Sequence, residues 1–283
     1  MPIVMNSNLA SLKAIRALGD TNKALGTTLA RLSSGIRVST AGDDASGVGV
    51  ASRMLSQIRG ANQAVRNAND AISLAQVADS GLSETVSNLQ SMRVLAVAAA
   101  NSSYLTADRA NMNLQFQALV ADIQRVAQGI AYNNTYLLSG GFANMNIQIG
   151  ANSGDVLSLT FLSATSSGLG ISGNVSLGGS DGTTATAAIT LVDNAIASVS
   201  YIRAVVGAQQ TRLQNAVSFT SSYSDTMTSS YSNVADTDIS QETSNLARLT
   251  IIQQVGVAIV AQANLQPQMV LSLLKQSTNS GSG

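Results

Sequence analysis

The most reactive-looking stretch of this sequence is residues 29–54, which read LARLSSGIRVSTAGDDASGVGVASRM. Adjacent carboxylates at Asp43 and Asp44, with hydroxyls and glycines close by, are typical of acid–base or phosphate-binding loops. A phosphate loop of the Gly-x-x-x-x-Gly-Lys type is excluded here, because Gly47 is followed by Val48 rather than lysine. An acid–base loop would need a third partner, and this stretch offers none.

The composition removes most other catalytic chemistry. The 283-residue chain has no Cys and no His, which excludes thiol nucleophiles, disulfides, His-based triads and nearly every zinc site. Its only glutamates are Glu84 and Glu242, far apart in sequence. We therefore expect no enzyme activity, no cofactor and no metal. Asp43 and Asp44 are instead predicted to stabilise the N-terminus of the helix that follows, by capping and by interaction with its dipole.

The charge pattern argues against nucleic-acid and membrane partners. Fifteen Lys and Arg balance fifteen Asp and Glu, so no basic surface for phosphates is expected. The longest apolar runs, residues 94–100 and 255–261, are too short to span a bilayer, and the start lacks the pattern of a Sec-type signal peptide. Aromatic residues make up only 4% of the chain, which suits narrow helix–helix seams better than a broad globular core.

Heptad-like spacing predicts one very long helix from about residue 45 to residue 101. Apolar residues recur there in alternating steps of three and four, and Asp79 and Arg93 interrupt the series. The series is Met54, Ile58, Ala61, Val65, Ala68, Ile72, Ala75, Leu82, Val86, Leu89 and Ala96. We interpret Ala61 and Ala68 as seam positions between subunits, where Leu would lock or block assembly.

The rest of the chain repeats the helical pattern around a single non-helical section. A second helix is expected at residues 106–129, capped by Thr106, and a further one at 189–234. Alternating residues in 145–161 predict two strands joined at a turn over 152–154. Residues 163–188 are rich in Gly, Ser and Thr and are expected to form loop or short irregular strand, with the Ser and Thr residues of 163–186 exposed. The fold class is mainly α: a long antiparallel helical rod or coiled-coil bundle with a small β region.

Both ends of the chain are predicted to be amphipathic helices with little charge. Such helices pair with each other or with another chain, because neither can bury its stripe alone. Membrane-surface helices usually carry Lys- and Arg-rich polar faces, whereas residues 239–283 contain only Arg248 and Lys275. We therefore favour self-assembly through Leu9, Leu12, Ile15, Leu29, Leu32, Leu246, Leu249, Ile252, Val255, Ile259, Leu271 and Leu274.

Several motifs resemble those of the bacterial flagellins. Residues 29–54 resemble the family's N-terminal signature, 88–103 the helix that follows, and 131–140 the turn after it. Residues 239–275, ISQETSNLARLTIIQQVGVAIVAQANLQPQMVLSLLK, resemble the C-terminal signature almost throughout. The likeness spans nearly the whole chain.

The resemblance implies a short flagellin without outer domains, secreted and assembled outside the cell for swimming motility. Its partners would be many copies of itself, together with an export chaperone, a filament cap and hook-junction proteins. It also implies that the opening loop, with Asp43 and Asp44, is a joint that contacts neighbouring subunits. The implied domains are an inner helix at 1–33, a rod part with the loop at 34–138, a β region at 139–188, a rod helix at 189–234, and an inner helix with a tail at 235–283.

Many flagellins are bound by a Toll-like receptor at the first long helix, and the matching residues here are only partly retained. Gln90, Arg93 and Leu95 match that pattern, and Asp122 stands where the family often has Glu. Ser91 and Val94 replace an Arg and a Glu, which removes charge-assisted hydrogen bonds. We therefore expect weak receptor recognition, with these residues acting as ordinary helix surface or subunit contacts.

Two other functions remain open at the level of sequence. A hook–filament junction protein shares the plan of paired terminal helices, and long filaments grown by the purified protein alone would distinguish a flagellin from it. A surface-displayed binding module or adhesin would need an exposed variable domain, for which residues 139–188 are a small candidate.

Overall fold

A computed structural model describes residues 8–141, 144–173, 175–179 and 182–279. The chain divides into a terminal unit, residues 1–54 with 229–283, and a central unit, residues 55–228. The helices are α1 (Leu9–Ser34), α2 (Ala45–Ala99), α3 (Thr106–Gly129), α4 (Thr183–Ala235) and α5 (Ile239–Asn279). Two small antiparallel hairpins pair β1 (Ala131–Tyr132) with β2 (Thr135–Tyr136) and β3 (Met145–Gln148) with β4 (Val156–Leu159). The predicted mainly α fold with a small β region is confirmed.

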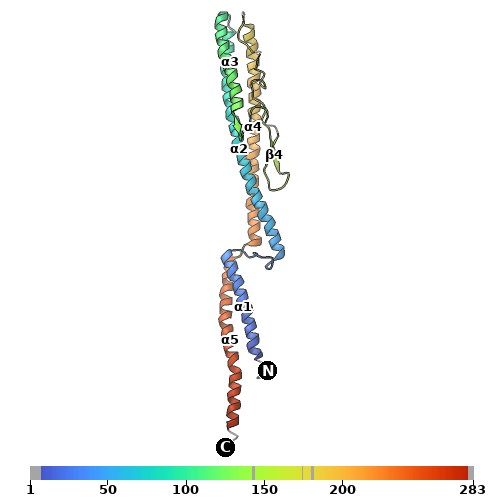
Figure 1. The fold of residues 1–283 in the computed structure, drawn as a ribbon, viewed down its shortest axis with the longest axis vertical. Helices are drawn as coiled ribbons and strands as arrows, with labels where there is room; N and C mark the ends of the chain where they lie inside the picture. Colours follow the sequence, from blue (N-terminus) through green and yellow to red (C-terminus); the bar gives the residue numbers. More distant parts are fainter. Residues whose placement is uncertain (1–7, 142–143, 174, 180–181, 280–283) are drawn as a thin grey trace. The chain divides into compact units, whose positions relative to one another are not determined.

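In the central unit, α2, α3 and α4 run alongside one another (Figure 1) and share one apolar core. The expected helix over residues 45–101 is confirmed: α2 begins at Ala45, as predicted, and ends at Ala99, two residues before the predicted end. Two heptad series of α2 are almost completely buried, at 2% exposure or less. One is Ala61, Ala68, Ala75, Leu82, Leu89 and Ala96; the other is Ala64, Ala71, Ala78, Thr85, Met92 and Ala99.

Only the first of these series was predicted; the second buried series was not predicted, and the series expected in its place was wrong. The predicted positions Val65, Ile72 and Val86 are only half-buried and flank the seam. Asp79 and Arg93 are therefore boundary residues rather than interruptions of the core. Both pair with α4: Arg203 Nε donates to Asp79 at 2.9 Å, and Arg93 Nε donates to Asp193 at 2.6 Å.

The turn between α2 and α3 differs from the prediction in its cap. Thr106 is the first helical residue rather than the N-cap, which is Leu105. The carboxylate of Asp108, three residues further on, accepts a hydrogen bond from the Leu105 backbone N–H at 3.1 Å. An acidic side chain in the first turn satisfies a free amide there and complements the helix dipole.

The β region forms where expected, and its surroundings are better packed than their composition indicated. Leu157 and Leu159 of β4 are buried, and the turn between β3 and β4 contains Gly154 at a φ of +94°. The unpredicted β1–β2 hairpin has Asn133 and Asn134 at positive φ, as a two-residue turn requires.

The segment after β4 is not an exposed loop. Phe161, Leu169, Ile171, Val175 and Leu177 are buried in the central core. Ser166 is also buried, and Gln124 Oε1 accepts hydrogen bonds from its backbone N–H and its hydroxyl. The expectation of exposed Ser and Thr over 163–186 is thus wrong at Ser166, because irregularly spaced apolar residues draw the segment inward. Helix α4 also begins at Thr183, six residues before the predicted start.

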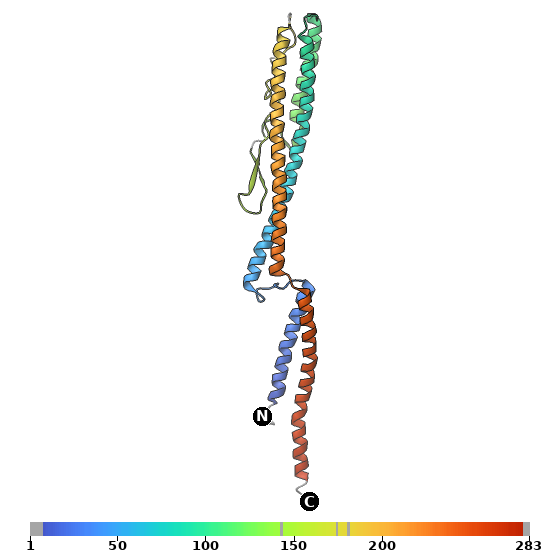
Figure 2. The ribbon, with the colours of Figure 1, turned by 180° about the vertical axis from the view of Figure 1, so that it is seen from behind.

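In the terminal unit, α1 and α5 lie side by side and antiparallel (Figure 2). Helix α1 begins after Asn8, whose Oδ1 accepts a hydrogen bond from the Ser11 N–H at 3.0 Å. It ends at Ser34, and its C-cap Gly35 adopts a φ of +70° and donates its N–H to the Arg31 carbonyl at 2.8 Å. Because left-handed backbone favours glycine, this residue gives the helix a sharp end.

Candidate functional site

The most unusual surface of the described chain is the helix pair of the terminal unit, here called the terminal pair (α1 with α5). Of the predicted assembly residues, seven are between 43% and 60% exposed: Leu9, Leu12, Ile15, Leu29, Ile252, Val255 and Ile259. Leu32, Leu246 and Leu249 are half-buried. Leu271 and Leu274 are in α5, but their side chains lie outside the described residues.

Two helices cover each other only on their facing sides, and the terminal pair has no third layer among the described residues. Small side chains line a groove of the pair, with Ala14, Ala17 and Gly256 beside Leu18 and Val255. A Cβ on Gly256 would lie 3.2 Å from the Leu18 side chain, so the helices approach closely at this point. Because the helices approach so closely, each buries only a narrow part of its apolar face, and the apolar residues on either side of the contact stay exposed.

Polar side chains align the terminal pair at two levels. Gln253 Nε2 donates to Asn22 Oδ1 at 2.7 Å, and Asn8 Nδ2 donates to the Ala263 carbonyl at 2.7 Å. Sequence reasoning found neither contact, because the partners are 231 and 255 residues apart.

The chain segments next to the terminal pair are joined to each other by backbone hydrogen bonds. Thr237 N–H donates to the Gly35 carbonyl at 2.9 Å, and Ile36 forms a β-bridge with Asp236. Arg37 donates its N–H to the Ala235 carbonyl at 2.7 Å and its guanidinium to the Val234 carbonyl at 2.6 Å. Arg37 therefore satisfies two carbonyls at the C-terminal end of α4, where helical partners run out.

The two aspartates of the opening loop have different roles. Asp44 Oδ1 accepts hydrogen bonds from the Ser46 N–H at 3.0 Å and the Gly47 N–H at 2.9 Å, as predicted for a helix cap. The Gly47 backbone bond, followed by the Ser46 hydroxyl, holds the pKa of Asp44 below its ordinary value. The predicted capping role is therefore confirmed for this residue.

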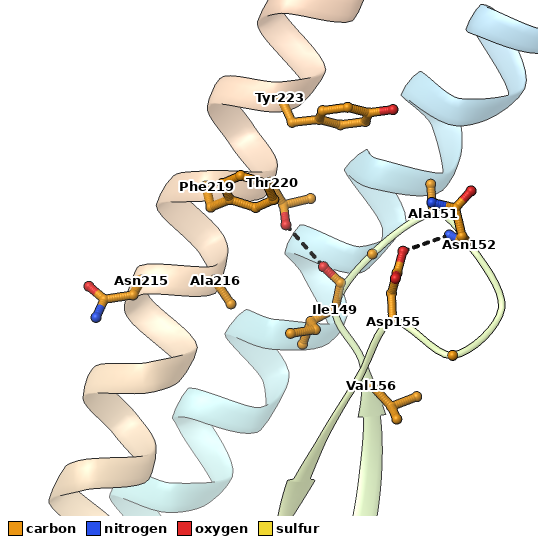
Figure 3. Close-up of a pocket in the computed structure, with 12 residues that line it drawn as sticks. Ile149, Ala151, Asn152, Asp155, Val156, Asn215, Ala216, Phe219, Thr220 and Tyr223 are labelled. Atoms are coloured by element: carbon orange, nitrogen blue, oxygen red, sulfur yellow. Dashed lines mark hydrogen bonds between the residues drawn. The ribbon is translucent and has the colours of Figure 1, made fainter.

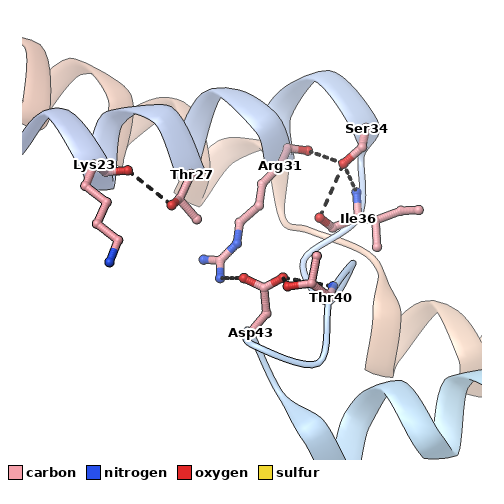
Figure 4. A network of polar contacts seen from close by, with 7 residues as sticks. All are labelled: Lys23, Thr27, Arg31, Ser34, Ile36, Thr40 and Asp43. Carbon is pink, nitrogen blue, oxygen red and sulfur yellow. Dashed lines mark hydrogen bonds and ion pairs between the residues drawn. The ribbon is translucent and has the colours of Figure 1, made fainter.

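For Asp43 the capping prediction is wrong. Its Oδ2 accepts the backbone N–H of Thr40 at 3.0 Å and the Thr40 hydroxyl at 2.8 Å, while Oδ1 lies 3.5 Å from the Arg31 guanidinium (Figure 4). The Thr40 hydroxyl is the main cause of a lowered pKa for Asp43. Asp43 closes the loop and connects it to the end of α1 instead of capping α2.

The four residues of the receptor motif do not form one free polar surface. Arg93 is paired with Asp193, and this hydrogen bond raises the pKa of its guanidinium. Asp122 accepts hydrogen bonds from Arg125, one turn further along α3. Gln90 is exposed and Leu95 is half-buried.

A pocket of the central unit lies between the β3–β4 turn and α4 (Figure 3). The Thr220 hydroxyl donates to the Ile149 carbonyl at 2.9 Å, and the Asn152 N–H donates to the Asp155 carboxylate at 3.0 Å. Asp155 is the one acidic residue lining it, beside the exposed ring of Phe219. No cluster of three or more potential metal ligands occurs among the described residues.

The mean hydropathy of α4 and α5 is higher than the shortness of their uninterrupted apolar runs indicated. An 18-residue window of α4 and another within Ile239–Met269 of α5 each reach a mean hydropathy of 1.4, enough by length and composition for a membrane span. The window in α5 is only 6% buried. Most residues of this window are therefore exposed in the single chain.

Comparison with known proteins places the chain in a family. Residues 5–143 match the bacterial flagellin N-terminal helical region, and residues 189–274 match the bacterial flagellin C-terminal helical region. A flagellin of Halalkalibacterium halodurans is 36% identical over 277 residues, covering 96% of this chain and 100% of the relative. The flagellar filament 33 kDa core protein of Treponema phagedenis is 37% identical over 286 residues, with the same coverage.

Among solved structures, the crystal structure of Bacillus cereus flagellin is similar to this chain with a TM-score of 0.49 and 28% identity, covering 54% of this chain and 88% of that one. The sequence matches reach both ends and most of the length. This chain therefore belongs to the bacterial flagellin family. It is a structural subunit of the bacterial flagellar filament, which is extracellular.

Proposed function

We propose that the terminal pair is the element through which this flagellin polymerises. The observation that carries the proposal is the exposed apolar surface on both α1 and α5, including Leu9, Ile15, Val255 and Ile259. Burying one Leu, Ile or Val side chain completely contributes about 1.5–3 kcal/mol. Several such contacts per subunit, repeated with each neighbour, would offset the entropy lost when the helices become ordered.

The low charge of the terminal pair fits neighbours of the same kind. Copies related head to tail, by a rotation that does not close a ring, form an open helical tube. We assign residues 1–33 and 235–283 to the inner layer of such a tube. Residues 34–138 and 189–234 would form a surrounding rod layer with the β region 139–188. The loop with Asp43 and Asp44 would be the joint between the layers and carries no catalytic role.

The alternative for the exposed stripe is a lipid bilayer. The hydropathy of α5 is compatible with it, but that helix alternates its apolar residues with Gln, Asn and Ser and has only two basic residues, Arg248 and Lys275. Interfacial helices depend on a basic polar face for attraction to anionic lipids. We therefore infer that other subunits, and not lipid, cover the stripe.

The direct test is electron microscopy of purified protein, full-length and lacking residues 1–33 or 239–283. The full chain is expected to grow long filaments by itself, whereas both truncated chains stay unassembled. Ile252→Gln should raise the concentration needed for assembly, and the matched Ile252→Leu should not. Truncated protein that still formed filaments would exclude the terminal pair as the assembly element, and short or monomeric full-length protein would favour the junction-protein alternative. Binding of the full chain to anionic vesicles without filament growth would favour the membrane alternative.

The remaining partners follow from the family alone. An export chaperone, a filament cap and hook-junction proteins are the partners we infer for a secreted flagellin. Toll-like receptor recognition is expected to be weak. Arg93 and Asp122 are already engaged within the chain, and Ser91 and Val94 offer no charge at the two substituted positions.

A further inference from the structure

Helix α5 contains a proline well inside its length, and this leaves one carbonyl without its helical partner. Pro267 lies between Ile239 and Asn279, and the helix continues through it. A helical residue normally donates its N–H to the carbonyl four positions earlier, but proline has no N–H. The acceptor that loses its donor is the carbonyl of Ala263, whose residue is only 7% exposed. A buried carbonyl without a partner is costly, so another donor is required there.

The donor comes from the other end of the chain. Asn8 Nδ2 donates to the Ala263 carbonyl at 2.7 Å, while Oδ1 of the same side chain accepts the Ser11 N–H and caps α1. The two ends of one amide thus serve two helices at once. Among the good N-cap residues, Asp could cap α1 equally well but has no hydrogen to donate to α5.

We propose that Asn8 and Pro267 form a matched pair that sets the register in which α1 and α5 combine. Elsewhere along α5, each interior carbonyl is available to the N–H four residues later, so none requires a donor from α1. If α1 moved by one turn along α5, the Asn8 amide would face a carbonyl that is already satisfied and Ala263 would lose its donor. Apart from the hydrogen bond between Gln253 and Asn22, the contacts of the pair are poor at fixing register, since small and aliphatic side chains line its groove.

The register matters because it decides which exposed residues of α1 lie beside which residues of α5. Leu9 follows Asn8 directly, Leu12 lies one turn after Asn8, and Ile259 lies one turn before Ala263. A fixed register gives every subunit the same apolar surface, which repeated contacts in a filament require. The inference rests on the proposed role of the terminal pair and names the residues that position it.

The test is a double-mutant comparison in the full-length chain. Asn8→Asp keeps the cap of α1, removes the donor and places a carboxylate against the Ala263 carbonyl. It should raise the critical concentration for filament growth roughly tenfold, the equivalent of one lost buried hydrogen bond. Pro267→Ala restores a backbone N–H for Ala263 and makes the Asn8 donor unnecessary. The loss of assembly caused by Asn8→Asp is therefore expected to be smaller in the Pro267→Ala background than in the wild-type background.

The matched control is Asn22→Asp, which adds the same charge to the same helix. Asn22 accepts a hydrogen bond from Gln253, and an aspartate would still accept it, so assembly should stay near wild type. An Asn8→Asp variant with normal assembly would overturn the proposal. An equal loss of assembly on introducing Asn8→Asp into the wild-type chain and into Pro267→Ala would also overturn it. These outcomes are separate from failure of the proposed function, which would appear as filaments grown by chains lacking residues 1–33 or 239–283.

Discussion

Arg109 is the one buried charged residue among the described residues of the central unit, and its role is structural. Its side chain is 2% exposed and donates to the carbonyls of Ala99 at 2.9 Å, Asn101 at 3.1 Å and Gly179 at 3.2 Å. A guanidinium offers five donors in a planar fork, so one side chain can close the C-terminal end of α2 and hold the following turn. Nothing in the local sequence separates Arg109 from an ordinary surface arginine.

Replacing Arg109 with methionine should therefore lower the free energy of unfolding by about 3 kcal/mol, because buried carbonyls lose their donors. Urea denaturation of the monomer measures the change. The control is Arg125→Met, in which an exposed arginine loses only its pair with Asp122. That change should stay within about 0.5 kcal/mol. Equal effects of the two substitutions would mean that the Arg109 hydrogen bonds contribute little.

Asp44 gives a residue-scale prediction about pH. Its pKa is lowered in the folded chain, so its contribution to stability is present above the ordinary value of 3.8 and is lost as the pH falls through the lower folded value. The Gly47 amide signal in an NMR titration should therefore change with a midpoint below 3.8. In Asp44→Asn this transition should vanish. A midpoint above 3.8 would show that the carboxylate is not held by these amides.

At the scale of elements, the seam of α2 belongs to the fold of the monomer. Ala68 and Ala71 pack with Leu157, Leu159 and Leu213 in a second core cluster of the central unit. The earlier interpretation of Ala61 and Ala68 as contacts between subunits is wrong for these side chains, which are at most 1% exposed within one chain. The small alanine side chains let α2 pack against β4 and α4 at this level.

Ala68→Leu is accordingly expected to destabilise the isolated monomer by about 1–3 kcal/mol through overpacking. Thermal or urea unfolding of protein held below its assembly concentration measures this. Gln76→Leu, at an exposed position of the same helix, is the control and should change stability little. Unchanged monomer stability together with altered filaments would favour the original contact between subunits.

At the scale of the whole molecule, the two units differ in how much of their apolar surface they bury. The central unit encloses a continuous core built from α2, α3, α4 and the segment after β4. In α1, the buried residues are the polar Ser11 and Thr28, while large apolar residues of both terminal helices remain exposed. Stability follows buried contacts, so the terminal pair is the weaker part until other copies cover it.

In dilute monomeric protein, backbone amides of α1 and α5 should therefore exchange with deuterium on the order of a hundredfold faster than those of α2 in the central unit. Mass spectrometry of timed exchange measures this, and filaments of the same protein should lose the difference. Equal protection of both units in the monomer would contradict the need for neighbouring copies.

The sequence by itself determined the helical fold class, the position of the β region and the exposed stripes at both ends, because these follow from periodicity and composition within short windows. It did not determine which heptad series of α2 forms the seam, since alanines at 64, 71 and 78 carry a weaker apolar signal than Val65 or Ile72. Only the tertiary structure decided the burial of Arg109 and the bond from Asn8 to Ala263. Those contacts depend on carbonyls that a turn or a proline has left free, and on which distant side chain the fold brings within reach of them.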